Sequence, residues 1–360
     1  MPFTEDVTVR FGLLLPQGYF DEFDGWAPSA AWDRVLEIAL TAERRGFDSV
    51  WLGEHVLAKW NQHEIVFDCV SLAASIAATV PRVEIGFSVV NSTFRNPAMT
   101  AKAAGTIDAV SGGRLVLGLG AGFKEREARA FGHPYPGLGE RLDILEEHFE
   151  IISRLTRRDE PPFDFKGRHA WVEQGVNGPA TGGRDHIPLL IGGHGKHKTF
   201  RIAARFCDEL NINLTPTEIP PYLEALHERC DEVGRDPSTI LLQWGSNPSI
   251  LYPGMRTTGG QRMMGPGDYP TSVIPTSGQI PLQPRPEILA GFRDLGFGRI
   301  VAGIPGLVNT FETLDEFIED CVAAGMSLPT PGASDQTVRA TLLPGRAHLF
   351  EREGGERINR

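Results

Sequence analysis

The sequence predicts an α/β fold, a (β/α)8 TIM barrel with an extended insertion after the seventh strand. Short runs rich in β-branched residues alternate with amphipathic helical segments, the pattern of repeated βα units around a parallel sheet. Eight such runs are present, and several are apolar over their whole length, as expected for strands buried on both faces. This count indicates a closed barrel, and a doubly wound open sheet is the alternative.

The expected elements follow one another along the chain. Strands are predicted at residues 9–15, 49–53, 83–89, 115–119, 187–191, 209–213, 240–244 and 299–303. Helices are predicted at residues 29–45, 97–110, 142–155, 199–206, 221–233, 287–295 and 314–323. In the first helix Trp32, Val35 and Ala39 fall on one face at i, i+3 and i+7. The last helix is expected to end at Gly325.

Two stretches interrupt this alternation. Residues 156–186 form a connection too long for a plain loop in a compact domain. Residues 245–286 are so rich in proline and glycine that a packed helix is excluded. Because this insertion follows the seventh strand, we expect an active-site lid, and a disordered surface insertion is the alternative. The chain is therefore predicted to be one barrel over residues 1–330 and a C-terminal tail over residues 331–360.

Composition and charge exclude several classes. The 35 basic and 46 acidic residues give a net charge of −11, which argues against a nucleic-acid partner. The N-terminal segment has no basic stretch and only a short apolar run, so neither a signal peptide nor a membrane span is expected. We expect a cytoplasmic protein. The four scattered cysteines (Cys69, Cys207, Cys230 and Cys321) indicate reduced core thiols, while a disulfide or a structural zinc site is less favoured.

Candidate catalytic groups follow the second strand. In a parallel barrel the active site lies at the carboxyl ends of the strands, and the second strand ends in WLGEH. Its His55 lies beside Glu54, and a histidine near a carboxylate can donate or accept a proton near neutral pH. This pair of residues alone is a weak signal. The alternative is that His55 only makes hydrogen bonds within its loop.

Two glycine-rich turns are candidate binding sites. Gly118, Gly120 and Gly122 after the fourth strand permit close backbone approach, but Phe123 stands where a GxGxxG fingerprint needs glycine. The fifth strand runs into GGHGK before a helix, where free backbone N–H groups and the helix dipole favour a phosphate. The basic residues nearby are Lys196, Lys198 and Arg201.

Other chemistries are disfavoured. The chain contains neither HExxH nor GxSxG, and His194 with His197 is a poor metal pair without carboxylates at compatible spacing. No metal site is therefore predicted. A barrel with an anion-binding loop and a histidine at a strand end suits a cofactor that carries phosphate.

Three segments together carry a family resemblance. They are FDSVWLGEH, the block from TFRNPAMTAKAAGTIDAVSGGRLVLGLGAGFKEREARAFG to GERLDILEEHFEII, and IPLLIGGHGKHKTFRIAARFCDELNIN. The chain resembles the bacterial luciferase-like superfamily of (β/α)8 oxidoreductases, which use FMN or the deazaflavin F420. The match covers residues 9 to about 324 and is loosest in the insertion.

The resemblance implies roles for matching positions. His55 is expected at the reactive face of the flavin or deazaflavin ring, with Glu54 orienting it. Ser88 and Val89 are expected to form a bulge behind the ring, often with a non-prolyl cis peptide. Further cofactor contacts are implied for Gly120, Gly122 and Phe123 beside the ribityl chain, and for Gly192, Gly193, His194 and Gly195 at the phosphate.

The choice of cofactor favours F420 over FMN. Residue 56 is valine, so the doubled histidine of luciferases is absent, and the RNP and SGGRLVLGLGAGF segments look more like the F420-dependent branch. The leading hypothesis is a cytoplasmic, homodimeric F420-dependent oxidoreductase that moves hydride to or from a small organic substrate. The alternatives are an FMN monooxygenase served by a separate reductase, and a flavin-binding barrel without turnover.

The substrate cannot be named from the residues, but its surroundings can be suggested. Candidate wall residues, each of which can equally be core, are Tyr252, Met255, Met263, Met264, Tyr269, Trp51, Trp60, Phe94 and Trp244.

Overall fold

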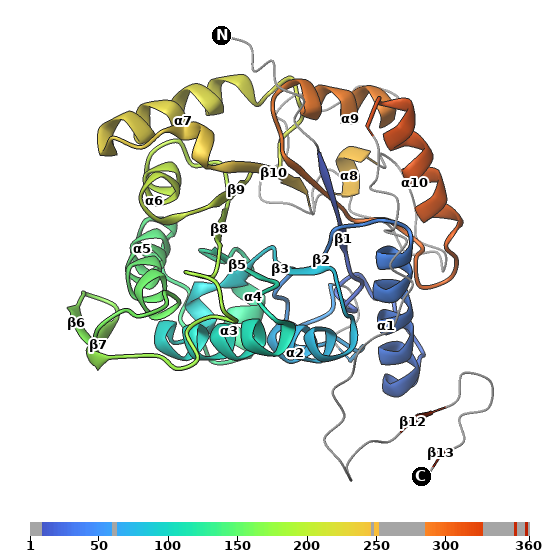
Figure 1. Cartoon of the computed structure of the whole chain (residues 1–360), viewed down its shortest axis with the longest axis horizontal. Helices are drawn as coiled ribbons and strands as arrows, with labels where there is room; N and C mark the ends of the chain where they lie inside the picture. The colour runs from blue at the N-terminus through green and yellow to red at the C-terminus, as the bar shows by residue number, and fades with distance from the viewer. Residues whose placement is uncertain are drawn as a thin grey trace. The chain divides into compact units, whose positions relative to one another are not determined.

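The eight predicted strands form a closed parallel barrel, which confirms the predicted fold. The computed structural model describes residues 9–59, 63–245, 248–251, 285–326, 349–350 and 357–358. Figure 1 shows the helices arranged around the strands. The barrel strands, in spatial order, are β1 (Arg10–Leu14), β2 (Ser49–Leu52), β3 (Glu84–Phe87), β5 (Leu115–Gly120), β8 (Leu189–Gly192), β9 (Glu209–Asn211), β10 (Leu241–Gly245) and β11 (Arg299–Ala302). Parallel pairing of β3 with β5 and of β11 with β1 closes the ring.

Helices connect the strands as predicted, with three additions. The helices are α1 (Pro28–Arg44), α2 (Cys69–Thr79), α3 (Pro97–Ser111), α4 (Glu125–Ala130), α5 (Leu138–Leu155), α6 (Lys198–Phe206), α7 (Pro220–Val233), α8 (Pro248–Leu251), α9 (Arg285–Asp294) and α10 (Glu312–Ala323). Helix α2 was not predicted, because its residues are almost all small or apolar and give no clear polar stripe. Helix α4 was not predicted either, because it is too short for periodicity to detect. The third addition, α8, corrects the expectation that residues 245–286 exclude a packed helix, because Ile250 and Leu251 supply one short apolar turn that is buried.

Helix α3 begins and ends where local chemistry requires. The Asn96 side chain accepts a hydrogen bond of 3.1 Å from the Met99 N–H, and Pro97 occupies the first helical position. Gly112 ends the helix with φ +73°, a conformation that favours glycine. Residues close to each end of α3 in the sequence therefore set where this helix begins and ends.

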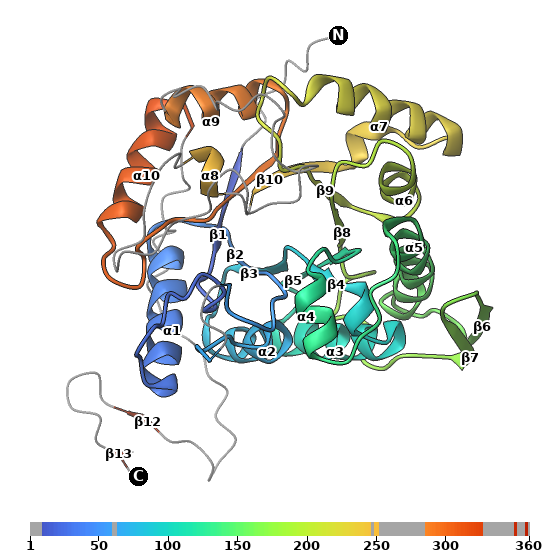
Figure 2. The same ribbon diagram turned by 180° about the vertical axis from the view of Figure 1, so that it is seen from behind.

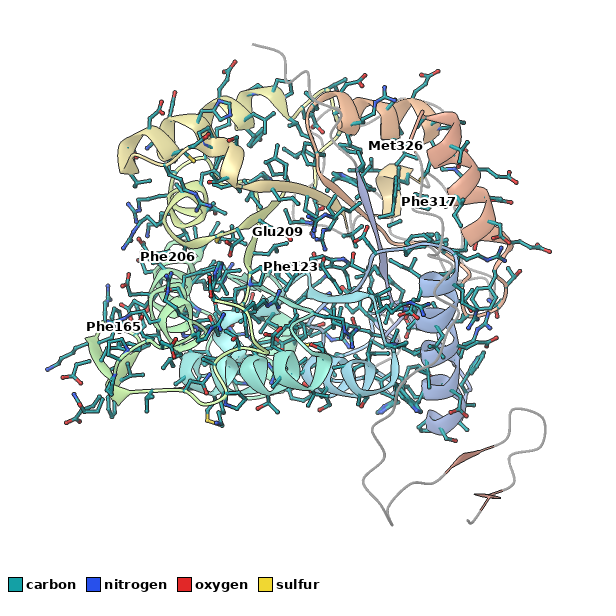
Figure 3. All side chains as sticks on the ribbon, in the orientation of Figure 1. Phe123, Phe165, Phe206, Glu209, Phe317 and Met326 are labelled. Atoms are coloured by element: carbon teal, nitrogen blue, oxygen red, sulfur yellow. The ribbon has the colours of Figure 1, made fainter. Side chains whose placement is uncertain are left out.

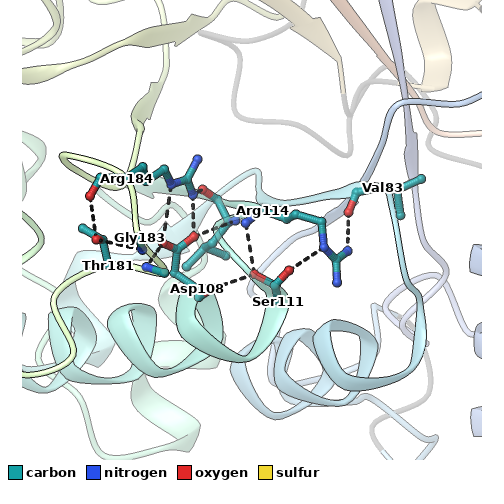
Figure 4. A network of polar contacts seen from close by, with 9 residues as sticks. Val83, Asp108, Ser111, Arg114, Thr181, Gly183 and Arg184 are labelled. Atoms are coloured by element: carbon teal, nitrogen blue, oxygen red, sulfur yellow. Dashed lines mark hydrogen bonds and ion pairs between the residues drawn. The ribbon is translucent and has the colours of Figure 1, made fainter. Parts of the chain in front are cut away.

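The long connection over residues 156–186 contains a hairpin and is tied to the barrel. Strands β6 (Phe163–Lys166) and β7 (Trp171–Gly175) pair antiparallel. Buried Asp108 near the end of α3 accepts hydrogen bonds from the Gly182 N–H at 2.6 Å and the Leu115 N–H at 3.0 Å, and pairs with Arg184 at 2.5 Å (Figure 4). One buried carboxylate therefore joins the helix, the next strand and the connection.

The interior of the barrel is filled by side chains. Trp51, Val116, Leu190 and Val301 pack together inside the ring. Two glycines make room for the Trp51 indole, because a Cβ at Gly12 would lie 2.5 Å from its Nε1 and one at Gly86 would lie 2.2 Å from its Cε3.

Three of the aromatic residues suggested for the substrate wall have packing partners. Trp51 is a core residue, and buried Trp244 stacks on Phe292 with ring centroids 4.6 Å apart. Phe94 stacks on His133 at 4.9 Å. Trp60 and the candidates of the insertion lie outside the described residues.

Charged residues close the amino-terminal end of the barrel. Arg299, the first residue of β11, is fully buried and lies 2.7 Å from Glu84 and 3.3 Å from Glu209. Glu84 and Glu209 are the first residues of β3 and β9, and Figure 3 labels Glu209 within the ring of strands. Burial raises the pKa of Glu209 to about 7, although Arg299 opposes this shift.

Glu209 should make stability depend on pH. Its folded-state pKa of about 7 exceeds the ordinary 4.5, so the folded protein holds this proton more tightly than the unfolded chain. The contribution is full below about pH 4.5 and is lost as the pH rises through about 7, on the order of 3 kcal/mol. Urea unfolding across this range should show the loss in the parent protein and a flatter profile in Glu209→Gln. The exposed-carboxylate control Glu287→Gln should keep the parent profile, and an unchanged profile in Glu209→Gln would contradict the assignment.

The chain divides into two compact units, Met1–Pro329 and Thr330–Arg360. In the second unit, β12 (Leu349–Phe350) pairs antiparallel with β13 (Arg357–Ile358). Most of the insertion expected as a lid lies outside the described residues. Among the helices of the described part, none combines the length and apolarity that a membrane crossing requires.

Candidate active site

The candidate site is built where β2 and β3 end. The Gly53 N–H donates to Gln17 Oε1 at 2.7 Å, and the Ser88 N–H donates to the Leu52 carbonyl at 2.7 Å. The Glu54 N–H donates to the Val89 carbonyl at 3.2 Å. These bonds hold three strand-end segments against one another and fix the backbone that carries Glu54 and His55.

The His55 ring is held by three side chains. Its Nδ1 lies 3.0 Å from a carboxylate oxygen of Glu127, which is buried on α4. Tyr19 stacks on the ring with centroids 3.4 Å apart and planes 13° apart. Phe123 meets the ring edge-on at 5.9 Å. Figure 2 shows α4 next to β4 (Val90–Asn91) and β5, so the fourth βα loop brings Glu127 to a histidine of the second.

This arrangement selects one tautomer of the imidazole. An ionised carboxylate only accepts hydrogen bonds, so Nδ1 carries the hydrogen that faces Glu127. The Nε2 atom makes no hydrogen bond with the described part of the chain. His55 can therefore accept a proton at Nε2 when neutral and donate one from Nε2 when charged.

Glu54 does not orient His55, which corrects that expectation. Its carboxylate accepts the Asn91 N–H at 2.6 Å and the Arg95 Nε–H at 2.6 Å. Glu54 and His55 are neighbours in the chain but contact different partners, Arg95 and Glu127. Burial raises the pKa of Glu54 despite the guanidinium. Glu54 holds the third βα loop in place, and Glu127 contacts the histidine.

A non-prolyl cis peptide, as implied for the expected bulge, follows the end of β3. The Ser88–Val89 peptide bond is cis. A Cβ at Gly120 would lie 2.5 Å from Val89 Cγ2, and one at Gly192 would lie 3.0 Å from Val89 Cγ1. The ends of β5 and β8 are therefore glycines because the Val89 side chain packs against their backbone.

Gly122 and Phe123 lie beside this bulge. Gly122 has φ +70°, and a Cβ there would lie 2.4 Å from Asn91 Oδ1. Only glycine satisfies both conditions without strain. The turn presents Phe123 as a large exposed ring next to His55, and Figure 3 labels Phe123 near the centre of the molecule.

The loop between β8 and α6 keeps donors suited to an anion. The Phe200 and Arg201 N–H groups of α6 donate to the Gly195 and His197 carbonyls at 3.1 and 3.0 Å, which leaves those of Lys198 and Thr199 without a backbone acceptor among the described residues. Gly193 has φ +135° and donates its N–H to the Asn211 carbonyl at 3.0 Å, which positions His194 and Gly195 ahead of the helix. A Cβ at Gly195 would lie 2.7 Å from Thr199 Oγ1. Gly193 and Gly195 are thus required by the backbone conformation and the close approach of Thr199.

Of the three cations predicted near this loop, two are used by α5. Lys198 pairs with Asp143, and Arg201 pairs with Glu146 at 2.8 Å. Lys196 makes no ion pair with the described residues, and its Nζ lies 4.5 Å from the centre of the Tyr222 ring. Of the three cations, Lys196 is thus the one that is not engaged by a carboxylate of the described residues.

One group in the described part of the chain brings three metal-ligand types together, Glu54, Asp68 and Cys69. Arg95 already pairs with both carboxylates, at 2.6 Å each. Burial raises the pKa of the Cys69 thiol well above its ordinary value, which keeps the thiol protonated. Because the Arg95 guanidinium already neutralises both carboxylates and the thiol keeps its proton, this group is unsuitable for a metal ion.

Neither Tyr19 nor Glu127 was predicted as a site residue. Both lie in βα loops, and such loops vary too much for periodicity to assign their residues. The one available signal for Glu127 was an acidic residue a few positions after the glycines of the fourth strand.

Comparisons with known proteins agree with this architecture. Residues 10–247 match the family model described as luciferase-like monooxygenase. An F420-dependent glucose-6-phosphate dehydrogenase of Amycolatopsis mediterranei is 38% identical over 136 residues, 37% of this chain and 40% of that protein. A 5,10-methylenetetrahydromethanopterin reductase of Archaeoglobus fulgidus is 31% identical over 193 residues, 53% of this chain and 51% of that protein. The chain thus spans about two fifths to one half of these relatives.

Solved structures share the fold at low sequence identity. An F420-dependent secondary alcohol dehydrogenase in complex with an F420-acetone adduct superposes with a TM-score of 0.68 at 18% identity, covering 88% of this chain and 99% of that one. The FMN-bound oxygenating constituent of 3,6-diketocamphane monooxygenase from Pseudomonas putida gives 0.61 at 16% identity, covering 89% and 100%. With a family model that matches well over half of its residues, the chain belongs to the luciferase-like monooxygenase family.

Proposed function

We propose that the protein is an F420-dependent oxidoreductase that transfers hydride between the deazaflavin and a small organic substrate. The observation that carries this proposal is His55, held through Nδ1 by Glu127 and unbonded at Nε2, at the carboxyl ends of the strands. The relatives named as F420-dependent support the choice of cofactor.

The residues present fit such a cofactor. The Ser88–Val89 bulge, packed on Gly120 and Gly192, offers a fixed surface for a planar ring. Gly122 and Phe123 would line the chain that leads away from the ring. Gly193, His194, Gly195 and Lys196 would hold the phosphate with the first N–H groups of α6.

The chain's own residues handle the proton. F420, when bound, accepts or supplies the hydride. If an alcohol is oxidised, its carbon loses the hydride while His55 Nε2 takes the hydroxyl proton, and in the reverse direction His55 returns that proton. Glu127 stabilises the charged imidazole during either step, and Tyr19 and Phe123 keep the ring in one orientation.

The main alternative is an FMN monooxygenase that takes reduced flavin from a separate reductase, a reading favoured by the FMN-bound relative of the same fold. A barrel that binds flavin without turnover is the second alternative. Titrating the purified protein with F420 and with reduced FMN under anaerobic conditions separates these functions. Tight binding of F420, and loss of F420H2 absorbance with carbonyl acceptors, is expected. Binding of reduced FMN but not F420 would overturn the proposal.

Other expectations complete the proposal. The four cysteines are all buried and unpaired, which supports a reducing, cytoplasmic setting. The proposal also includes a homodimer and a separate reductase that recycles F420. The chain would form a single barrel over residues 1–330, with residues 245–286 as a lid.

Replacing Glu127 by glutamine should lower kcat by about tenfold to a hundredfold with little change in KM. The amide keeps the size of the side chain but removes the charge that stabilises the protonated His55. Steady-state kinetics with F420 measure both constants. Glu125→Gln, on the exposed side of the same helix, is the matched control and should retain parent activity. Equal losses in both variants would show that α4 is disturbed as a whole.

Replacing Lys196 by alanine should weaken F420 binding by about tenfold, because a charged hydrogen bond to the phosphate is lost. Fluorescence titration with F420 gives the dissociation constant. Lys198→Ala removes an equal charge two residues away, but this charge is already paired with Asp143. We expect a much smaller effect there, and the opposite order would exclude Lys196 as the phosphate ligand.

A further inference from the structure

A cavity lies beside the barrel, outside the candidate active site. Its volume is about 480 Å³, within the range of small-molecule sites. It is bounded by the start of α3, helix α5 and the β6–β7 hairpin. The lining residues are Ser92, Thr93, Arg95, Asn96, Pro97, Pro134, Pro136, Ile144, His148, His169, Ala170 and Trp171. We call it the lateral cavity, and neither His55 nor Glu127 lines it.

The lateral cavity contains polar groups without partners. His148 is only 5% exposed, yet neither ring nitrogen makes a hydrogen bond in the described structure. Ser92 Oγ and His169 Nε2 are also buried without a partner. A buried polar group left unsatisfied costs about 1–3 kcal/mol. Two such groups around one cavity, beside the largely buried His148 ring, indicate a place where a ligand or ordered water supplies the missing bonds.

The polar groups of the lateral cavity are neutral or neutralised. Burial lowers the pKa of His148 to about 4, so its imidazole is uncharged near neutral pH. Arg95 pairs with Glu54 and Asp68 at 2.6 Å each. No acidic side chain lines the cavity. The surroundings therefore suit an uncharged ligand better than an ion.

The cavity also has an aromatic wall on a fixed support. Trp171 is 70% exposed, an unusual state for an indole. The turn before it is fixed to α5, because Glu147 accepts the N–H groups of Arg168 at 2.7 Å and of His169 and Ala170 at 2.8 Å each. An indole on a rigid hairpin provides a flat surface on which a ring can stack.

We propose that the lateral cavity is an accessory binding site for an uncharged ring that carries hydroxyl groups. A hydroxyl both donates and accepts, so it can bond to Ser92 Oγ, to His169 Nε2 and to the neutral imidazole of His148. The ring stacks on Trp171 beside Pro134 and Pro136. Two kinds of compound share this chemistry, phenols and pyranose sugars, and the site does not depend on the proposed redox activity.

Binding measurements with both probes test the proposal. Resorcinol and methyl α-glucopyranoside are titrated into the full-length protein and followed by saturation-transfer NMR and calorimetry. We expect one of them to bind at millimolar concentration or better. His148→Phe, which keeps a buried ring, should weaken binding at least tenfold. Trp171→Ala should do the same without a folding risk, because the side chain is exposed. His55→Ala should leave binding unchanged, which separates this site from the active site.

Three results would overturn the proposal. Neither probe binding would mean that only water fills the cavity. Binding as tight as in the parent protein in both His148→Phe and Trp171→Ala would place the probes elsewhere. Sedimentation showing a dimer that Trp171→Ala dissociates, with no probe binding, would show that a second copy of the chain covers this face.

Discussion

Replacing His55 by alanine is expected to lower kcat by about 10²-fold to 10⁴-fold while F420 still binds. The substitution removes the one imidazole nitrogen that the site leaves available for proton transfer, and positioned acid–base groups contribute rate factors of this size. Glu127 and Tyr19 lose their partner but remain in place on separate loops. Turnover measured with F420 together with a fluorescence titration of F420 separates the chemical step from binding.

The control for this experiment is another histidine in an ion pair. His186 lies 2.9 Å from Asp208 and is partly exposed outside the site, so His186→Ala should retain parent turnover. A His55→Ala protein with full activity would remove the general acid–base role. In that case the proton would have to come from another group or from water.

Replacing Arg299 by methionine is expected to destabilise the protein by about 3–5 kcal/mol. Its guanidinium is fully buried between Glu84 and Glu209, and breaking a buried ion pair by removing one partner leaves the other charges uncompensated. Methionine fills much of the arginine volume, so a cavity contributes little. The loss should be larger above pH 7, where Glu209 is ionised in the folded protein. Urea unfolding at pH 6 and pH 8 measures both effects.

Arg10→Met is the matched control for this substitution. Arg10 is the first residue of β1 and lies 3.9 Å from the same Glu84, but about half of its side chain is exposed. An exposed pair contributes less than about 1 kcal/mol, so this variant should unfold close to the parent midpoint. Equal destabilisation by the two substitutions would show that the attraction to Glu84 matters and the burial does not.

The fold was predictable because its signal lies in short-range patterns. Apolar runs such as the one in β5 mark strands buried on both faces, and the stripe of α1 marks a helix with one buried face. Helix α2 was missed because small residues such as Ala73 and Ala77 leave no contrast between its faces.

The candidate site was predictable only in part. His55 follows from the rule that barrel active sites lie at strand ends, and the phosphate loop follows from glycines ahead of a helix. The sequence did not show that Lys198 and Arg201 pair with Asp143 and Glu146 on α5. It therefore could not single out Lys196 among the three basic residues near this loop. Such pairs join residues more than fifty positions apart, and no local pattern reports them.

The sequence by itself determined the barrel, the strand-end histidine and the glycine turns, since each depends on neighbours along the chain. Only the tertiary structure decided that Glu127, 72 residues away, contacts His55, and that the adjacent Glu54 holds Arg95. The physical reason is that closure of the barrel brings loops from different strands to one edge, so the partner of a side chain there comes from another loop and not from its neighbour in the chain.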